Sequence, residues 1–183
     1  MKGMSKSTPA IILAAGESSR LGTPKALVKW GEETLVARAN RLLQEFGCKP
    51  IIVVTRKELQ VDVMLNCPNS HIVVNKKPED GRTGTLQLGL MKIISEMGRT
   101  PRRVFVVPVD RCGWNIQTLE YLSECETNTS PNPSGHPLML CDIDLVLNLE
   151  KDSSLRDSIQ IAKIDAPGRH LNIDTPDDLE ALQ

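Results

Sequence analysis

The sequence predicts an α/β protein with a mainly parallel sheet that is covered by helices. Short apolar runs alternate with amphipathic segments along nearly the whole chain. The runs are apolar throughout rather than alternating in polarity, which is typical of strands buried on both faces. Because predicted strands and predicted helices follow one another in turn, a parallel α/β sheet is favoured over separate helical and strand regions.

The predicted strands are five brief apolar runs. None has the period-two alternation of a strand with one face in water, so each is expected to lie inside the sheet. They are residues 10–14, 51–54, 71–74, 103–107 and 137–141.

Helices are predicted wherever apolar residues recur at helical spacing. The pattern over 35–46 ends at Gly47 and the pattern over 86–97 ends at Gly98, and glycine is the usual residue after a helix. Thr83 or Thr85 is a candidate N-cap for the second of these helices. Weaker patterns are found over 58–65 and 114–124, and 175–182 opens with Thr-Pro and aspartates, a favourable helix start. The polar stretch 127–135 is expected to form a loop at a mobile rim.

Length and charge restrict the kind of protein that this can be. A chain of 183 residues, 40% of them hydrophobic, suits one domain over 9–183 after a flexible polar tail over 1–8. A net charge of −1 gives no general attraction to nucleic acid or to a membrane surface. No apolar run reaches membrane length, and five widely spaced cysteines do not suggest a disulfide framework. We expect a cytoplasmic monomer or small homo-oligomer.

The stretch LAAGESSRLGTPKAL, residues 13–27, is the main candidate for a binding loop. Its spacing fits neither the dinucleotide fingerprint nor the Walker loop. Gly16 lets backbone amides approach an anion, and Arg20 and Lys25 place two positive charges around one turn. Pro24 favours a fixed direction for Lys25 as the chain leaves the turn. The stretch therefore suggests a triphosphate site, with an ordinary surface turn carrying two solvated cations as the alternative.

Asp110 is the main candidate for a metal ligand. It follows the predicted strand 103–107, so its carboxylate can face the same crevice as Gly16 at the carboxyl ends of the strands. Mg²⁺ prefers one or two carboxylates together with phosphate oxygens. The alternative is an aspartate that only forms a turn.

Several stretches together resemble the MobA-like nucleotidyltransferases, which include the molybdenum-cofactor guanylyl- and cytidylyltransferases and are related to sugar-nucleotide pyrophosphorylases. The matching stretches run in family order from about residue 10 to the end of the chain. They are LAAGESSRLGTPKAL (13–27), NKKPEDGRTGTLQLGL (75–90), VFVVPVD (104–110), GHPLML (135–140) and LNIDTPDDLEAL (171–182).

The resemblance implies a three-layer α/β/α, doubly wound sheet with one antiparallel strand. It also implies Mg²⁺-dependent transfer of a nucleoside monophosphate from an NTP to a phosphorylated small-molecule acceptor, molybdopterin being one example, with release of pyrophosphate. On this basis Arg20 and Lys25 contact the phosphates and Asp110 binds Mg²⁺, while Asp174 or Asn172 supplies a second metal ligand. The nucleotide is lined by residues Leu13, Ala14, Ala15 and Gly16. For Asp174 the alternative is a helix N-terminal role beside Thr175-Pro176.

Other candidate residues have weaker support. Asn75 and the loop from Gly81 to Thr85 could contact ribose or base, or could form an ordinary helix entry. His136 could face the acceptor, although a structural histidine is the more common case. Arg111 belongs to the segment Asp-Arg-Cys-Gly-Trp, where many family members have a proline two residues after the aspartate, and it could contact an acceptor phosphate or offset Asp110.

The sequence does not settle which nucleotide base is recognised or whether the protein is catalytic. The Ala-Ala-Gly of residues 14–16 resembles cytidylyltransferases more than the Ala-Gly-Gly of guanylyltransferases, so CTP is favoured over GTP. The altered segment 110–114 keeps a non-catalytic nucleotide-binding or regulatory protein as an alternative. An NAD(P)-dependent oxidoreductase is disfavoured because the G-x-G-x-x-G fingerprint is absent.

Overall fold

The computed structural model describes residues 7–183, and its core is a seven-stranded sheet in the order β5-β4-β1-β6-β8-β7-β9. Residues 1–6 of the expected tail lie outside the described part. The strands are β1 (Ala10–Ala14), β4 (Ile51–Thr55), β5 (His71–Val74), β6 (Val104–Pro108), β7 (Thr129–Pro131), β8 (Leu138–Leu140) and β9 (Ala162–Ile164). A separate hairpin joins β2 (Lys29–Trp30) to β3 (Glu33–Thr34).

The sheet is parallel except for β8. This strand runs antiparallel to both of its neighbours, β6 and β7, whereas β1 is parallel to β4 and β6, β4 to β5, and β7 to β9. The expectation of a mainly parallel sheet with one antiparallel strand is confirmed, and all five predicted strands are present.

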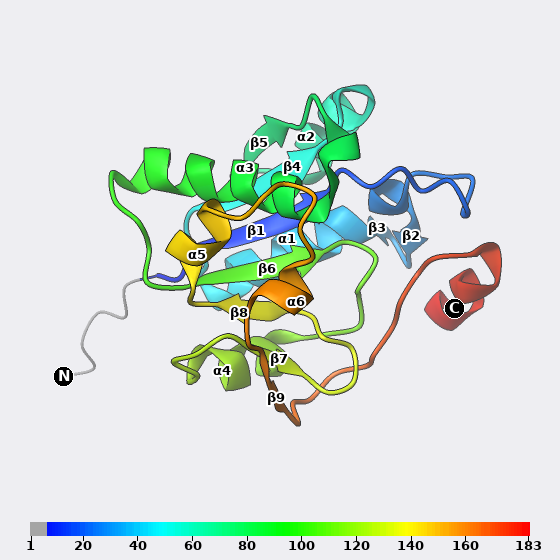
Figure 1. The fold of residues 1–183 in the computed structure, drawn as a ribbon. Coiled ribbons are helices and arrows are strands. Elements are labelled where there is room, and N and C mark those ends of the chain that lie inside the picture. The colour runs from blue at the N-terminus through cyan, green and yellow to red at the C-terminus, as the bar shows by residue number, and fades with distance from the viewer. Residues whose placement is uncertain (1–6) are drawn as a thin grey trace.

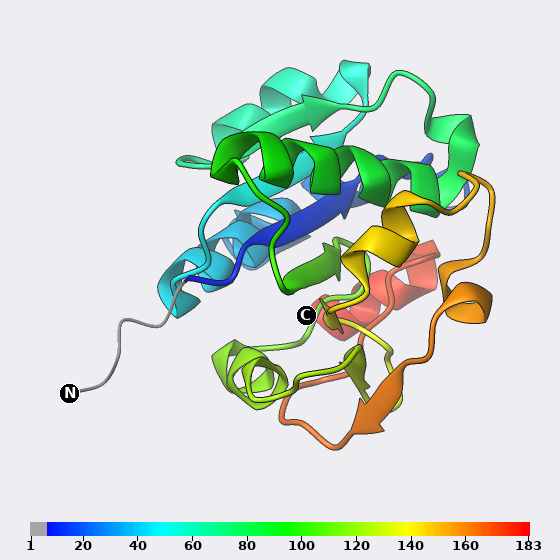
Figure 2. The same cartoon turned by 60° about the vertical axis from the view of Figure 1, so that its left-hand side comes forward.

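Helices cover both faces of the sheet (Figures 1 and 2). One face packs against α1 (Leu35–Phe46), α2 (Gln60–Asn66) and α4 (Ile116–Ser123), and the other against α3 (Gly81–Met97), α5 (Ile143–Leu147) and α6 (Leu155–Ser158). The alternation of side chains along β1 explains the two layers, because Ile12 belongs to the first core and Ile11 to the second. A Cβ on Gly89 would lie 2.8 Å from Ile11 Cγ2, so glycine lets α3 approach β1 closely.

Both long helices end where the glycines predict. Gly47 and Gly98 have φ of 96° and 67°, in the left-handed region that glycine adopts without a steric penalty. The predicted start of α3 is wrong, because the helix begins at Gly81 and therefore contains both Thr83 and Thr85 rather than being capped by either. Residues 81–85 are thus the first turn of a helix and not a loop.

The polar stretch 127–135 is also different from the prediction. Its residues Thr129–Pro131 are buried as β7, between β8 and β9. Asn128 makes this burial possible, because its Oδ1 accepts from the amides of Cys141 and Asp142 and its Nδ2 donates to Gln160 O. The side chain thereby ties the start of β7 to the segments on both sides.

The C-terminal segment completes the fold beside the loop after β1. Its 3-10 helix, η4 (Pro176–Leu182), begins directly after the N-cap residue Thr175, in agreement with the Thr-Pro start, and a capping box joins Thr175 to Asp178. Ile173 and Leu182 form a small third core with Leu21, Val28 and residues of the neighbouring loops. Of the helices in residues 7–183, none has both the length and the apolar character needed to cross a membrane.

Candidate active site

A cleft of about 300 Å³ lies at the carboxyl ends of β1 and β6. This is the edge of the sheet where open α/β proteins bind ligands. The cleft brings together most of the predicted nucleotide residues and one further predicted metal ligand, Asp174. The nucleotide residues are Leu13, Ala14, Ala15, Gly16, Arg20, Lys25, Gly81, Thr85 and Asp110. The expectation that the cationic loop and Asp110 share one cleft is met.

The loop after β1 places Lys25 by means of Ser18. Ser18 has φ of 56° and its carbonyl accepts from the amides of Leu21 and Gly22, which turns the chain back on itself. Its hydroxyl oxygen accepts from the Lys25 amide at 3.0 Å. The short helix η1 (Lys25–Leu27) starts directly after Pro24 and orients the lysine side chain toward the cleft.

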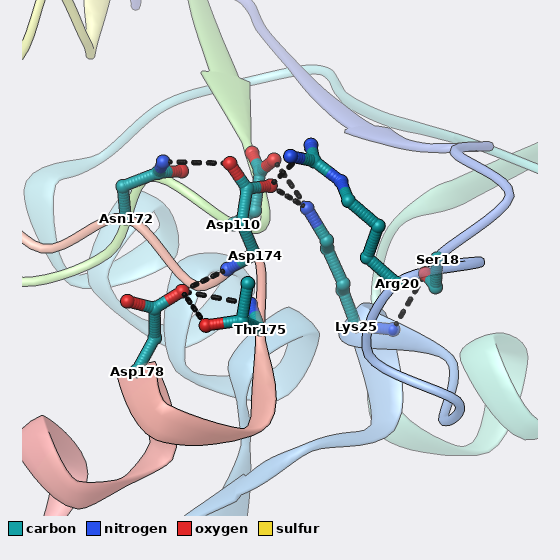
Figure 3. Close-up of polar contacts among 8 residues, drawn as sticks. All are labelled: Ser18, Arg20, Lys25, Asp110, Asn172, Asp174, Thr175 and Asp178. Carbon is teal, nitrogen blue, oxygen red and sulfur yellow. Dashed lines mark hydrogen bonds and ion pairs between the residues drawn. The ribbon is translucent and has the colours of Figure 1, made fainter.

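Lys25 bridges two carboxylates that are remote in sequence (Figure 3). Its ammonium donates to Asp110 Oδ2 at 3.1 Å and also to Asp174 Oδ1. The side chains of Lys25 and Asp110 are only 14% and 11% exposed, so this pair is poorly screened by water. Arg20 approaches the same oxygen of Asp174 at 3.5 Å from a side chain that is 71% exposed. The Lys25 ammonium is thus fixed between the two carboxylates, and the Arg20 side chain extends from the surface.

Asp174 reaches Asp110 because residues 169–173 run alongside 110–113. The amides of Arg169, Leu171 and Ile173 donate to the carbonyls of Gly113, Cys112 and Asp110 respectively. A Cβ at Gly113 would lie 2.5 Å from Arg169 O, and Gly113 has φ of 98°, so this close approach requires glycine.

Residues 110–113 therefore provide the strand-like contact that carries the C-terminal segment to the cleft. Asp174 itself is held by Asp178, whose Oδ2 accepts from the amides of Asp174 and Thr175.

The electrostatics of the cleft favour the charged form of Asp174. The hydrogen bond from Lys25, followed by that from Asn172, lowers the pKa of Asp174 to about 2. Asp174 is therefore ionised across the physiological range. The cations Arg20 and Lys25 and the carboxylates of Asp110 and Asp174 balance one another.

These oxygen ligands fit a hard divalent cation. Carboxylates from two segments face one place in the cleft, and Mg²⁺ takes one or two carboxylates with phosphate oxygens. Asn172 donates through Nδ2 to Asp174 at 2.9 Å, while its Oδ1 is buried without a hydrogen-bond partner among the described residues. Within residues 7–183 no cluster of three or more His, Cys, Asp or Glu side chains is present, so phosphate oxygens and water would complete the coordination.

Asn75 supports the cleft from behind rather than lining it. It is buried, its Nδ2 donates to Thr85 Oγ1 at 3.0 Å, and its Oδ1 accepts from the Lys77 amide. Thr85 and Gly81, at the start of α3, do line the cleft. Asn75 therefore does not line the cleft itself and reaches it only through its hydrogen bond to Thr85, which does.

The two residues expected on the acceptor side, His136 and Arg111, do not lie in the same cavity. His136 lines a second cavity of about 570 Å³ that adjoins the first, whereas Arg111 lines neither. Arg111 makes no ion pair with Asp110, whose partner is Lys25, and its Nε is buried without a hydrogen-bond partner in the described part of the chain.

Arg82 belongs to the candidate segment from Gly81 to Thr85 but is not singled out by the sequence, and the structure places it in the walls of both cavities.

Comparisons with known proteins agree with this geometry. Over residues 10–160 the chain matches the model of the MobA-like NTP transferase domain. It is 35% identical over 96 residues to a bifunctional IPC transferase and DIPP synthase of Thermococcus kodakarensis, covering 50% of this chain and 22% of the relative. It is 42% identical over 52 residues to a probable molybdenum cofactor guanylyltransferase of Opitutus terrae, covering 28% of this chain and 26% of the relative. The matches thus span about a quarter of these curated relatives.

Solved structures share the fold at low sequence identity. Rv0371c of Mycobacterium tuberculosis H37Rv has a TM-score of 0.77 and 20% identity, with 97% of this chain and 98% of that chain covered. A manganese complex of Rv0371C has also been solved, with a TM-score of 0.73 and 17% identity, covering 96% of this chain and 97% of that one.

Two further structures are named for cytidine nucleotides. The inositol-1-phosphate CTP transferase of T. maritima has a TM-score of 0.69 and 16% identity, with 97% and 94% covered. The CTP:phosphocholine cytidylyltransferase of Streptococcus pneumoniae has a TM-score of 0.70 and 18% identity, with 96% and 97% covered. These structures share the fold, and the family match over residues 10–160 shows that the chain belongs to the MobA-like NTP transferase family of nucleotidyltransferases.

Proposed function

We propose that the protein transfers a nucleoside monophosphate from CTP, or from GTP as the second choice, to a phosphorylated small-molecule acceptor such as molybdopterin, and releases pyrophosphate. The observation that carries the proposal is the convergence of Lys25, Asp110 and Asp174 in the cleft beside Gly16. This is the arrangement that a metal-bound triphosphate needs, with cations for the phosphate oxygens and carboxylates for the metal.

In this proposal the chain contributes positioning and electrostatics. An oxygen of the acceptor phosphate attacks the α-phosphorus, the bond from that phosphorus to the bridging oxygen of pyrophosphate breaks, and the charge moves onto the leaving group. Lys25 and Arg20 stabilise that charge, and the exposed Arg20 can close over the phosphates once they are bound. A phosphate oxygen is already nucleophilic, so the reaction needs no strong general base.

Asp110 and Asp174 are the proposed Mg²⁺ ligands, with Asn172 orienting Asp174. The chemistry that a bound divalent ion supplies in such a site is neutralisation of phosphate charge. The manganese complex of a protein with the same fold is consistent with a divalent ion. Lys25 now bridges both carboxylates, so we expect its ammonium to shift toward phosphate oxygens when nucleotide and metal are present.

Support for the base and the acceptor comes from residues 14–16 and from named relatives. The Ala-Ala-Gly sequence resembles cytidylyltransferases, and the T. maritima and S. pneumoniae proteins of this fold are named for CTP. The O. terrae relative is named for molybdenum cofactor and guanylyl transfer, which keeps GTP and molybdopterin in the proposal.

A pyrophosphate-release screen tests the proposal. Each of the four NTPs is supplied with Mg²⁺ and a panel of phosphorylated acceptors that includes molybdopterin. We expect release only with the matching acceptor, fastest with CTP, and at least about 100-fold slower in Asp110→Asn. Asp62→Asn is the matched control, because Asp62 is an exposed aspartate at the start of α2, outside the cleft.

The alternative of a non-catalytic nucleotide-binding protein predicts a different pair of results. CTP or GTP would then raise the melting temperature of the protein, since a ligand that binds only the native state stabilises it, but no acceptor would release pyrophosphate. That combination would overturn the catalytic proposal and leave nucleotide binding intact.

A further inference from the structure

The second cavity, of about 570 Å³, adjoins the nucleotide cleft. The two share four residues of their walls, Leu13, Gly81, Arg82 and Pro108. Apolar side chains of β6, β8 and α3 contribute to its wall, namely Val106, Leu138 and Leu86. A molecule in this cavity would therefore lie next to whatever the first cleft holds.

The charged lining of this cavity is mostly basic. It includes the cations Arg82, Lys151, Arg156 and Lys163 and the carboxylates Asp152 and Asp157. Lys151 is paired with Asp80 at 3.4 Å. Among residues 7–183, the other three cations have no carboxylate within 4.0 Å, so they are available to an anion.

Lys163 is held in place on β9. Its ammonium donates to Ser130 Oγ on β7 at 2.7 Å, and a Cβ at Gly135 would lie 3.4 Å from it. Burial, followed by the positive charge of Arg156, lowers the pKa of Lys163. Two cations that repel each other and share no acidic partner are an unfavourable arrangement that a bound anion relieves.

Lys163 lies too far from the reacting end for one phosphate to contact both Lys163 and the groups beside Asp110. Strands β6, β8, β7 and β9 follow one another across the sheet (Figure 1). Lys163 Nζ lies at β7, two strand spacings or about 10 Å from β6, after which Asp110 follows. A phosphate that attacks beside Asp110 therefore leaves Lys163 without an anion.

His136 lies between these two ends. The charges that act on its ring come from Arg111, Asp110, Arg82 and Lys163, and its Nδ1 is buried without a hydrogen-bond partner in the described part of the chain. Burial is the main cause that lowers the pKa of His136 to about 4, so the ring is neutral at pH 7. A neutral histidine in the wall of this cavity adds no charge there, so the anion of a ligand is left to the cations.

Resting on the proposed function, we infer that the acceptor occupies this second cavity and carries a second anionic group, remote from the attacking phosphate and bound by Lys163 and Arg156. The second group is a carboxylate or a second phosphate. The substrate class is thus a small phosphate ester with two separated anions. Arg82, on the wall that both cavities share, is assigned to the attacking phosphate.

Two pairs of probes, each matched in carbon skeleton, test the inference by calorimetric binding. Glycerol 3-phosphate against 3-phosphoglycerate tests a carboxylate, and fructose 6-phosphate against fructose 1,6-bisphosphate tests a second phosphate. We expect the doubly anionic member of at least one pair to bind about tenfold more tightly. The preference should fall to near parity in the double variant Lys163→Gln/Arg156→Gln.

The controls separate this inference from the proposed function. Lys163 and Arg156 line the second cavity and not the nucleotide cleft, so the double variant should bind CTP with Mg²⁺ as the unchanged protein does. Lys49→Gln, an exposed lysine just before β4, should keep the preference for two anions.

Equal binding within both pairs, no binding of any probe, or a preference that survives in the double variant would overturn the inference even where CTP binds. Failure of CTP to bind the unchanged protein would instead overturn the proposed function.

Discussion

Replacing Lys25 by methionine is the sharpest test of the site, because one ammonium neutralises two carboxylates. Methionine keeps most of the aliphatic packing and removes only the charge. In the variant, Asp110 and Asp174 would face each other without the cation that now lies between them. We expect the native state to lose stability and the carboxylates to become more difficult to ionise.

The magnitude follows from the geometry. At 3.1 Å and an effective dielectric constant of about 20, the Lys25–Asp110 attraction is about 5 kcal/mol before desolvation. Removing one partner of a buried pair costs about 3–5 kcal/mol, and the opening of the cleft to water reduces that figure. We therefore expect the free energy of unfolding to fall by about 2–3 kcal/mol without nucleotide or metal.

Urea denaturation measures the loss, and a double-mutant cycle assigns it. Lys25→Met/Asp110→Asn should recover at least half of the lost stability, because the unpaired buried carboxylate is removed as well. Mg²⁺ should raise the melting temperature of Lys25→Met more than that of the unchanged protein, since the carboxylates no longer have to exchange an ammonium for the ion. The same stability in Lys25→Met as in the exposed-residue control Lys49→Met, or equal Mg²⁺ effects, would refute the reasoning.

Three further predictions concern the surroundings of the cleft. Asp174→Asn should reduce the rate of pyrophosphate release at least about 10-fold in a steady-state assay, and an unchanged rate would exclude Asp174 from the metal site. Gly113→Ala should lower the unfolding free energy by at least about 2 kcal/mol, because the added Cβ meets a positive φ and also clashes with Arg169 O. The control Gly98→Ala has a positive φ but open space around the Cβ, so it should lower the unfolding free energy by only about 1 kcal/mol. Equal losses in the two variants would argue against the close contact at Gly113. The His136 ring, with its pKa lowered to about 4, should titrate near that value by NMR. The unfolded chain takes up the proton near pH 6.5, so the unfolding free energy should fall by about 3 kcal/mol between pH 6.5 and pH 4. In His136→Gln the unfolding free energy should depend less steeply on pH over this range.

Much of the architecture could be predicted from local patterns. The runs at 10–14 and 51–54 are uniformly apolar and form interior strands of the sheet, and Gly47 and Gly98 end their helices. Strands of this kind and helix ends are determined by residues close together in the chain, so the spacing of residue types in the sequence is enough to predict them.

Local patterns failed where distant parts of the chain supply the partners. Thr129–Pro131 is polar and bordered by turn-forming residues, which predicts a loop, yet it is buried between β8 and β9 because Asn128 satisfies amides and carbonyls on either side. The first turn of α3 was misplaced for a related reason, since no side chain caps it and its Gly84 amide instead donates to Lys151 O. Neither contact can be read from a window of residues.

The residues of the cleft could be identified from the sequence, but their contacts with one another could not. Lys25 is separated from Asp110 by 85 positions and from Asp174 by 149, and the resemblance supplied the three names without their contacts. The family match ends at residue 160, yet one of the two carboxylates belongs to the segment that follows. That segment reaches the cleft only because Gly113 admits the backbone of Arg169 and the ladder continues to Ile173. Gly113 of the unusual Asp-Arg-Cys-Gly-Trp segment is thus accounted for by the docking of residues 169–173, which brings Asp174 to the cleft beside Asp110.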